Sequence, residues 1–189
     1  MHVVDYDPDW PRLAAAAADA LRTAAPGLFV ALEHIGSTAV PGLAAKPVID
    51  HGGPPARAKS RVGEGAVPDL ADVGPHQPAL AALGFRPHDN GMTDRLLYVR
   101  ADGGTRSHIL HVVTYDSWPT RNQRILRDYL RAHPEEAARY AELKRAIVAA
   151  GTPARDYSRA KTALVQELTD RARAEFGLPP EPVWEKGTK

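Results

Sequence analysis

The 189-residue sequence contains no cysteine, which excludes disulfides, thiolate nucleophiles and metal sites built on cysteine. It also has no long hydrophobic run: the longest nearly apolar stretch, residues 13–21, is mostly alanine and too short to span a bilayer. The first residues lack the basic and apolar regions of a secretory signal peptide. These absences predict a soluble, cytoplasmic protein that does not bind a membrane.

An excess of one charge is missing as well. The chain has 24 Lys and Arg against 23 Asp and Glu, which leaves a net charge of +1. Proteins dedicated to duplex nucleic acids take most of their affinity from a basic excess. The balance therefore argues against a duplex partner, while it leaves room for a small basic pocket for a nucleotide.

Hydrophobic residues make up 43% of the chain, enough for one packed domain of ordinary size. Apolar runs predict short strands at residues 28–35 and 47–50, and a hairpin of residues 95–100 and 107–114 around Gly103-Gly104. Helical periodicity predicts helices over residues 10–21, 78–83, 119–132, 134–150 and 155–176. Strands early and helices late predict an α+β fold, with helices packed on a small mixed β-sheet.

The predicted organisation is one domain over residues 1–177, followed by a flexible C-terminal tail at 178–189. Residues 52–66 are atypical, because they are rich in glycine and proline and include Pro54-Pro55. Paired prolines cannot serve a central strand, since they lack the N–H groups of the ladder. This segment is either an inserted loop or the product of a local reading-frame error.

The most informative run is EHIGSTAVPGLAAKPVID, at residues 33–50. Gly36 lets the backbone approach a ligand closely, and Ser37 and Thr38 offer hydroxyl and N–H groups suited to phosphate oxygens. Asp50, with Lys46 nearby in sequence, would supply a carboxylate for Mg²⁺ bound to a triphosphate. Each residue also has a plainer interpretation, because Gly-Ser often follows a strand and aspartate often forms turns or helix caps.

The run as a whole closely resembles the signature of the GrpB (UPF0157) family. The resemblance extends to VDYDPDWP at residues 4–11, to RSHILHVV at residues 106–113 and to the helical half, so that it covers residues 2 to about 176. That family is assigned to the nucleotidyltransferase-like fold. The resemblance therefore implies binding of a nucleoside triphosphate with Mg²⁺ and nucleotidyl transfer to an unidentified acceptor.

Carried over residue by residue, the resemblance places Gly36 and Ser37 on the phosphate turn. It makes Asp50 the catalytic carboxylate that binds the metal, and we expect Lys46, Arg106 and Lys161 to bind phosphate charge.

The sequence departs from the superfamily pattern at Gly52, where a second metal-binding carboxylate would stand two residues after Asp50. Whether the protein is an enzyme is left open by this departure. The alternative is a catalytically inactive nucleotide-binding or folding-accessory module on the same fold.

Four further side chains are candidates. Residues three apart on a strand point to opposite faces, so His108 and His111 cannot chelate one ion without a bulge. His34 is either a site residue or a hydrogen-bonded structural histidine, and Glu33 is either a strand-edge charge or part of a metal shell.

Arginines recur at helical spacing at positions 124, 127 and 131. This stripe is either a solvated face paired with acids such as Asp128 or a wall for a triphosphate. On the last predicted helix, Lys161 is within reach of a phosphate and Tyr157 is expected in the core.

Overall fold

The computed structural model describes residues 2–55, 70–89 and 91–183. Its contacts divide the chain into two compact units. One consists of Met1–Pro8, Ile35–Pro47 and Thr120–Lys189, and is called the helical unit below. The other consists of Asp9–His34 and Val48–Pro119, and is called the sheet unit. The single domain predicted over residues 1–177 stays a prediction.

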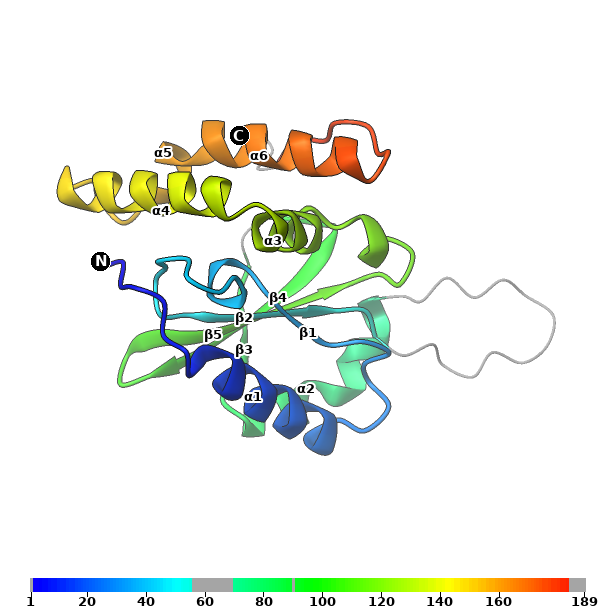
Figure 1. The fold of residues 1–189 in the computed structure, drawn as a ribbon. Helices are drawn as coiled ribbons and strands as arrows, with labels where there is room; N and C mark the ends of the chain where they lie inside the picture. The colour runs from blue at the N-terminus through cyan, green and yellow to red at the C-terminus, as the bar shows by residue number, and fades with distance from the viewer. Residues whose placement is uncertain (1, 56–69, 90, 184–189) are drawn as a thin grey trace. The chain divides into compact units, whose positions relative to one another are not determined.

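A five-stranded sheet has the strand order β1-β2-β5-β4-β3 (Figure 1). The strands are β1 (Glu33–Ile35), β2 (Ile49–Gly53), β3 (Arg86–Pro87), β4 (Arg95–Asp102) and β5 (Thr105–Val113). β2 runs parallel to β5, whereas β4 pairs antiparallel with both β5 and β3. The predicted α+β class with a small mixed sheet is therefore confirmed, and so is the hairpin that joins β4 to β5.

One face of this sheet is covered by helices α1 (Trp10–Ala24) and α2 (Gln77–Ala82), the latter preceded by the 3-10 helix η2 (Leu70–His76) (Figure 1). The apolar side of α1 contributes Leu21 to a core that also contains Leu80, Phe85 and Leu110. These four side chains are almost completely buried. The face of the sheet under α1 is thus the hydrophobic core of the sheet unit.

β2 continues past Asp50, the predicted end of its apolar run, as far as Gly53. A Cβ atom on Gly53 would lie 1.9 Å from the carbonyl oxygen of Ala31, so only glycine fits this close approach of two backbones. The first residues of the atypical segment 52–66 therefore belong to the sheet. Residues 56–66 lie outside the described residues.

The helical unit contains α3 (Asn122–Ala132), α4 (Pro134–Ala149), α5 (Tyr157–Ala160) and α6 (Thr162–Glu175). α3 follows the 3-10 helix η3 (Trp118–Thr120). α4 and α6 run side by side (Figure 1) and are joined by an ion pair of 2.8 Å between Arg139 and Glu167. The core of this unit draws on α3, α4, α6 and the segment at residues 40–44.

Two predicted elements are shorter than expected. The helix predicted over residues 155–176 is divided into α5 and α6 at Lys161, and the strand predicted over residues 28–35 is reduced to β1. Part of the predicted flexible tail is hydrogen-bonded to α6. The Gln166 side chain donates from Nε2 to the Glu181 carbonyl and accepts at Oε1 from the Val183 N–H. The flexibility of residues 178–189 stays a prediction.

In the part of the chain that the structure describes, no helix combines the length and apolarity needed to cross a membrane. The cytoplasmic location stays a prediction.

Candidate functional site

The residues predicted to form the site are divided between the two units. The helical unit holds Gly36, Ser37, Thr38, Lys46 and Lys161. The sheet unit holds Glu33, His34, Asp50, Arg106, His108 and His111.

The predicted phosphate turn is the short 3-10 helix η1 (Ser37–Ala39). It begins after Gly36, whose φ of 74° favours glycine because a side chain would be strained there. Ser37 is half-buried and therefore reachable, whereas Thr38 is only 1% exposed. Arg131, on α3, contacts the end of this turn: its Nε donates to the Ala39 carbonyl at 2.9 Å.

The arginines at positions 124, 127 and 131 do not form one solvated face. Arg127 is only 7% exposed and donates two hydrogen bonds, of 2.7 and 3.0 Å, to the Asp128 carboxylate. Arg131 binds the turn described above. The expected pairing with Asp128 is present: Arg127 makes it from a buried position, and Arg131, whose side chain is 44% exposed, lies 3.8 Å from the same carboxylate.

Three lysines and two tyrosines form a connected group in the helical unit, which we call the lysine–tyrosine cluster. The Lys46 Nζ lies 3.8 Å from the centre of the Tyr157 ring, and the Lys161 Nζ lies 5.4 Å from the same centre. Lys161 also donates to the Tyr140 hydroxyl at 3.2 Å. Finally, the Lys144 Nζ lies 4.3 Å from the centre of the Tyr140 ring. Lys46 and Lys161 thus place ammonium groups beside two phenol rings, where cation–π attraction applies, and a third lysine, Lys144, lies against one of the same rings.

Lys144 is the member of this cluster that sequence reasoning missed. Its side chain is 2% exposed, and among the described residues its Nζ has no hydrogen-bond partner. Burial lowers the pKa of Lys144 to about 7, with further lowering from the positive charges of Lys161 and Arg145. The only local signal was its position one helical turn after Tyr140, which also fits an ordinary surface lysine.

In the sheet unit, strand register fixes which candidates share a face. Asp50 is paired with Ile109, and Gly52 is paired with His111. Asp50 and His111 therefore project from the same face of the sheet, on neighbouring parallel strands. His108 is paired with Ile49, so it projects from the opposite face. The prediction that His108 and His111 point to opposite faces is confirmed.

The face under α1 carries a row of three imidazoles. The His51 ring lies 6.2 Å from the His34 ring and 6.3 Å from the His108 ring, measured between centroids. The His51 Nε2 donates to the Ala14 carbonyl of α1 at 2.9 Å, because a carbonyl can only accept. Since His34 lies on this face, alternation along β1 directs Glu33 to the face of Asp50.

Burial favours the neutral form of two of these imidazoles, His51 and His108. His51 is completely buried, and burial is the main reason that its pKa is lowered. Burial also lowers the pKa of His108 to about 4, with a second contribution from the charge of Arg100. His51 therefore lies in the core as a hydrogen-bonded histidine that had not been singled out in the sequence, whereas His34 and His108 are half-buried.

The fit of Mg²⁺ to the sheet unit is limited by the number of carboxylates. Gly52 supplies no ligand two residues after Asp50, and no three His, Asp or Glu side chains in the described residues are grouped to hold a metal. Mg²⁺ characteristically keeps several waters and binds one or two carboxylates together with substrate phosphates. Asp50 therefore fits one Mg²⁺ held mainly by phosphates, but a pair of metals does not fit the residues present.

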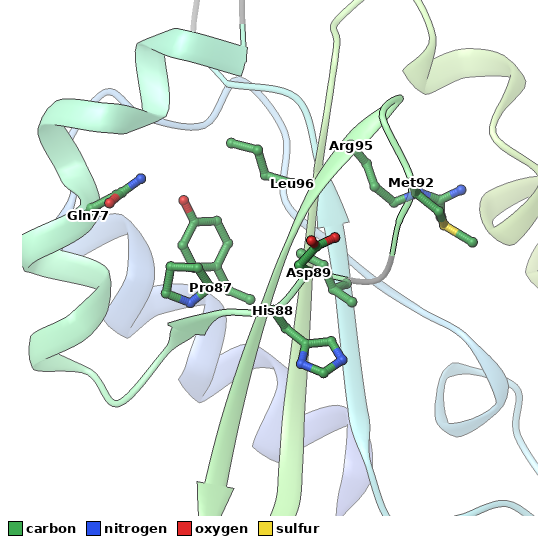
Figure 2. Close-up of a pocket in the computed structure, with 9 residues that line it drawn as sticks. Gln77, Pro87, His88, Asp89, Met92, Arg95 and Leu96 are labelled. Carbon is green, nitrogen blue, oxygen red and sulfur yellow. The ribbon is translucent and has the colours of Figure 1, made fainter. Parts of the chain in front are cut away.

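Arg106 is exposed at the start of β5, opposite Ala101 of β4 and next to the irregularity in this pairing. It is not in the pocket of about 250 Å³ at the β3–β4 edge of the sheet. That pocket is lined by polar and apolar side chains together (Figure 2), among them Gln77, His88, Asp89, Met92 and Arg95. None of the predicted site residues lines it.

Comparison with known proteins gives one consistent result. A family model described as "GrpB protein" matches residues 1–171. A UPF0157 protein of Pseudomonas aeruginosa is 37% identical over 183 residues, which cover 92% of this chain and 68% of the relative. A UPF0157 protein of Streptomyces coelicolor is 34% identical over 149 residues, which cover 78% and 72%.

Among solved structures, the crystal structure of the conserved protein GrpB from Enterococcus faecalis matches with a TM-score of 0.80 and 25% identity. The match covers 93% of this chain and 99% of that one. A likeness to the Cid1 poly(U) polymerase, with a TM-score of 0.46 and 15% identity over 75% of this chain and 45% of the polymerase, is too distant to bear on the chemistry here.

Proposed function

This chain belongs to the GrpB family, and from its lysine–tyrosine cluster we propose that it binds a nucleoside triphosphate together with Mg²⁺. The phosphates would contact Lys46 and Lys161 of the cluster and the backbone and hydroxyl groups of the Gly36-Ser37 turn. Arg106 stays a further candidate, as predicted from the sequence.

The observation that carries this proposal is the gathering of three lysine side chains around two tyrosine rings in the helical unit. Positive charges gathered in one place repel one another. A polyphosphate would relieve this repulsion, because each phosphate oxygen offers a negative acceptor for a lysine donor. The family resemblance, which puts Gly36-Ser37 on a phosphate turn, supports the same ligand class.

Asp50 is the carboxylate proposed to bind Mg²⁺. This role comes from the family resemblance, and Mg²⁺ held by a carboxylate and phosphates supplies positive charge to the phosphate oxygens. Asp50, His111 and Glu33 share one face of the sheet, which makes His111 and Glu33 the residues to test beside Asp50. One carboxylate does not hold two metals, so the residues present do not supply a two-metal site for transfer.

A second candidate function is nucleotide binding without transfer, as in a sensor or folding-accessory module. Gly52 favours it, because this position lacks the second carboxylate of a two-metal transferase. Incubation with an α-labelled triphosphate separates the two: release of pyrophosphate supports transfer to an acceptor, and binding without release supports the module.

The direct test is calorimetry with ATP, GTP, CTP and UTP, each with and without Mg²⁺. We expect binding of at least one triphosphate, weakened about tenfold to a hundredfold by Lys46→Met, since a charged hydrogen bond contributes about 1.5–3 kcal/mol. Asp50→Asn should remove the part of the affinity that depends on Mg²⁺. Arg155→Met changes an arginine that is 86% exposed and is the matched control. Absence of binding heat for every triphosphate would refute the proposal.

A further inference from the structure

We propose that Lys144 is the proton-accepting member of the lysine–tyrosine cluster: a bound polyphosphate converts its buried amine to an ammonium group, so that ligand binding takes up one proton. This inference rests on the proposed function and adds to it a third lysine that responds to the charge of the bound phosphates.

The first ground is the burial of Lys144 without a hydrogen-bond partner. Its side chain is 2% exposed, and its Nζ finds no acceptor among the described residues. A buried ammonium group without an acceptor is costly, because it loses its hydration and gains no hydrogen bond in return. The amine form, which carries a lone pair and no charge, avoids that cost.

The second ground is the charge of the surroundings. On α4 itself, Tyr140 and Arg145 lie near Lys144, and Arg145 is paired with Asp5 at 2.5 Å. Lys161, between α5 and α6, also acts on Lys144 and contacts the Tyr140 hydroxyl. Tyr157 and Lys46 complete the charged and titratable groups of the cluster. Burial is the main cause that lowers the pKa of Lys144 to about 7, and the charges of Lys161 and Arg145 lower it further. An anion would reverse the electrostatic part of this shift, because a negative charge favours the ammonium form.

The proton balance is simple. At pH 8 a group with a pKa of about 7 is neutral in about nine molecules of ten. When the anion arrives, the Nζ lone pair of Lys144 takes a proton from the buffer, and the negative charge of the phosphates stabilises the ammonium form. Binding at pH 8 would therefore take up about 0.9 proton for each site.

The test is calorimetry of the full chain with MgATP at pH 8.0 in HEPES and in Tris, whose ionisation enthalpies differ. We expect the binding enthalpies to differ by the amount that uptake of about 0.9 proton requires. We also expect the affinity to fall by about tenfold for each pH unit between 7.5 and 9, in proportion to the loss of ammonium form. Lys144→Met should abolish both effects.

Lys46→Met is the matched control, because it removes a lysine of the same cluster that does not act on the titration of Lys144. It should weaken binding and retain the proton uptake. A second measurement needs no variant: the ¹³Cε resonance of Lys144 should titrate near pH 7 in the free protein and above pH 9 with MgATP bound.

Equal binding enthalpies in the two buffers would overturn this inference while the proposed function stands. Proton uptake that persists in Lys144→Met would overturn it as well. Absence of binding by any triphosphate would instead remove the proposed function, and the inference with it.

Discussion

Arg131 and Ala39 are 92 residues apart in sequence, yet the Nε of Arg131 donates to the Ala39 carbonyl at 2.9 Å. Ala39 is the last residue of η1, the turn that begins with Ser37. Helix α3 thereby fixes the end of a turn whose start depends on the positive φ of Gly36. The conformation of the predicted phosphate turn is thus maintained from two sides within the helical unit.

Arg131→Met should loosen this turn. The substitution retains the apolar stem of the side chain but leaves the buried Ala39 carbonyl without its charged donor. We expect a loss of about 1–2 kcal/mol in the free energy of unfolding, measured with urea. Triphosphate binding should weaken as well, provided that the turn contacts phosphate. An unchanged stability, equal to that of Arg155→Met, would contradict the anchoring role.

Gly53→Ala should be severely destabilising. The new Cβ atom would lie 1.9 Å from the carbonyl oxygen of Ala31, and a backbone atom cannot move aside without distorting the sheet. We expect a loss of about 3 kcal/mol or more in the free energy of unfolding. The control is Gly74→Ala, where nothing lies within 4 Å of the added atom and the change should stay within about 1 kcal/mol. Equal melting temperatures for the two variants would refute the close approach.

Local signals in the sequence were sufficient to predict most of the helices and strands. Gly103-Gly104 predicted the hairpin because both positions require positive φ, and Pro134 with Gly151 delimited α4 because they mark opposite helix ends. The division of the last helix at Lys161 was not predicted, because the apolar periodicity of residues 155–176 continues through it.

Features that depend on segments far apart in the sequence could not be predicted from local patterns. The row formed by His34, His51 and His108 exists only because three strands adopt one register, and no local pattern encodes that register. The burial of Lys144 likewise depends on how α4 packs, since a lysine on an amphipathic helix is ordinarily solvated. By contrast, the family resemblance was already visible in residues 33–50.

Acid should destabilise the sheet unit through His108. Burial lowers the pKa of this histidine to about 4 in the folded state, against about 6.5 in the unfolded chain. Between these values the unfolded chain binds the proton and the folded protein does not, so the free energy of unfolding falls as the pH falls from 6.5 to 4. We expect about 1–3 kcal/mol from this residue.

Urea unfolding at intervals between pH 7.5 and 4 measures this effect. His108→Phe keeps an aromatic ring beside Phe85 and removes the titration, so its stability should depend less on pH than that of the wild type. The carboxylates are the same in both proteins and cancel in the comparison. Parallel curves for wild type and variant would show that His108 is not held neutral by the fold.

Lys144→Met should make the free protein more stable at pH 7. The wild-type amine has a pKa of about 7 in the folded state and about 10.5 in the unfolded chain, so the unfolded chain binds the extra proton between these values. The free energy of unfolding of the wild type therefore falls as the pH falls from 10.5 to 7. Methionine fills a similar volume without a charge, and should raise the stability at pH 7 by about 2–4 kcal/mol.

The gain from Lys144→Met should shrink as the pH rises toward 10, where the unfolded chain also loses its proton. Urea unfolding of both proteins at pH 7, 8.5 and 10 measures it. A destabilised variant, or a gain independent of pH, would mean that Lys144 is charged and stabilised in the free protein. A buried amine that costs stability in the absence of ligand is the expected signature of a residue kept for binding, because the bound anion supplies the missing partner.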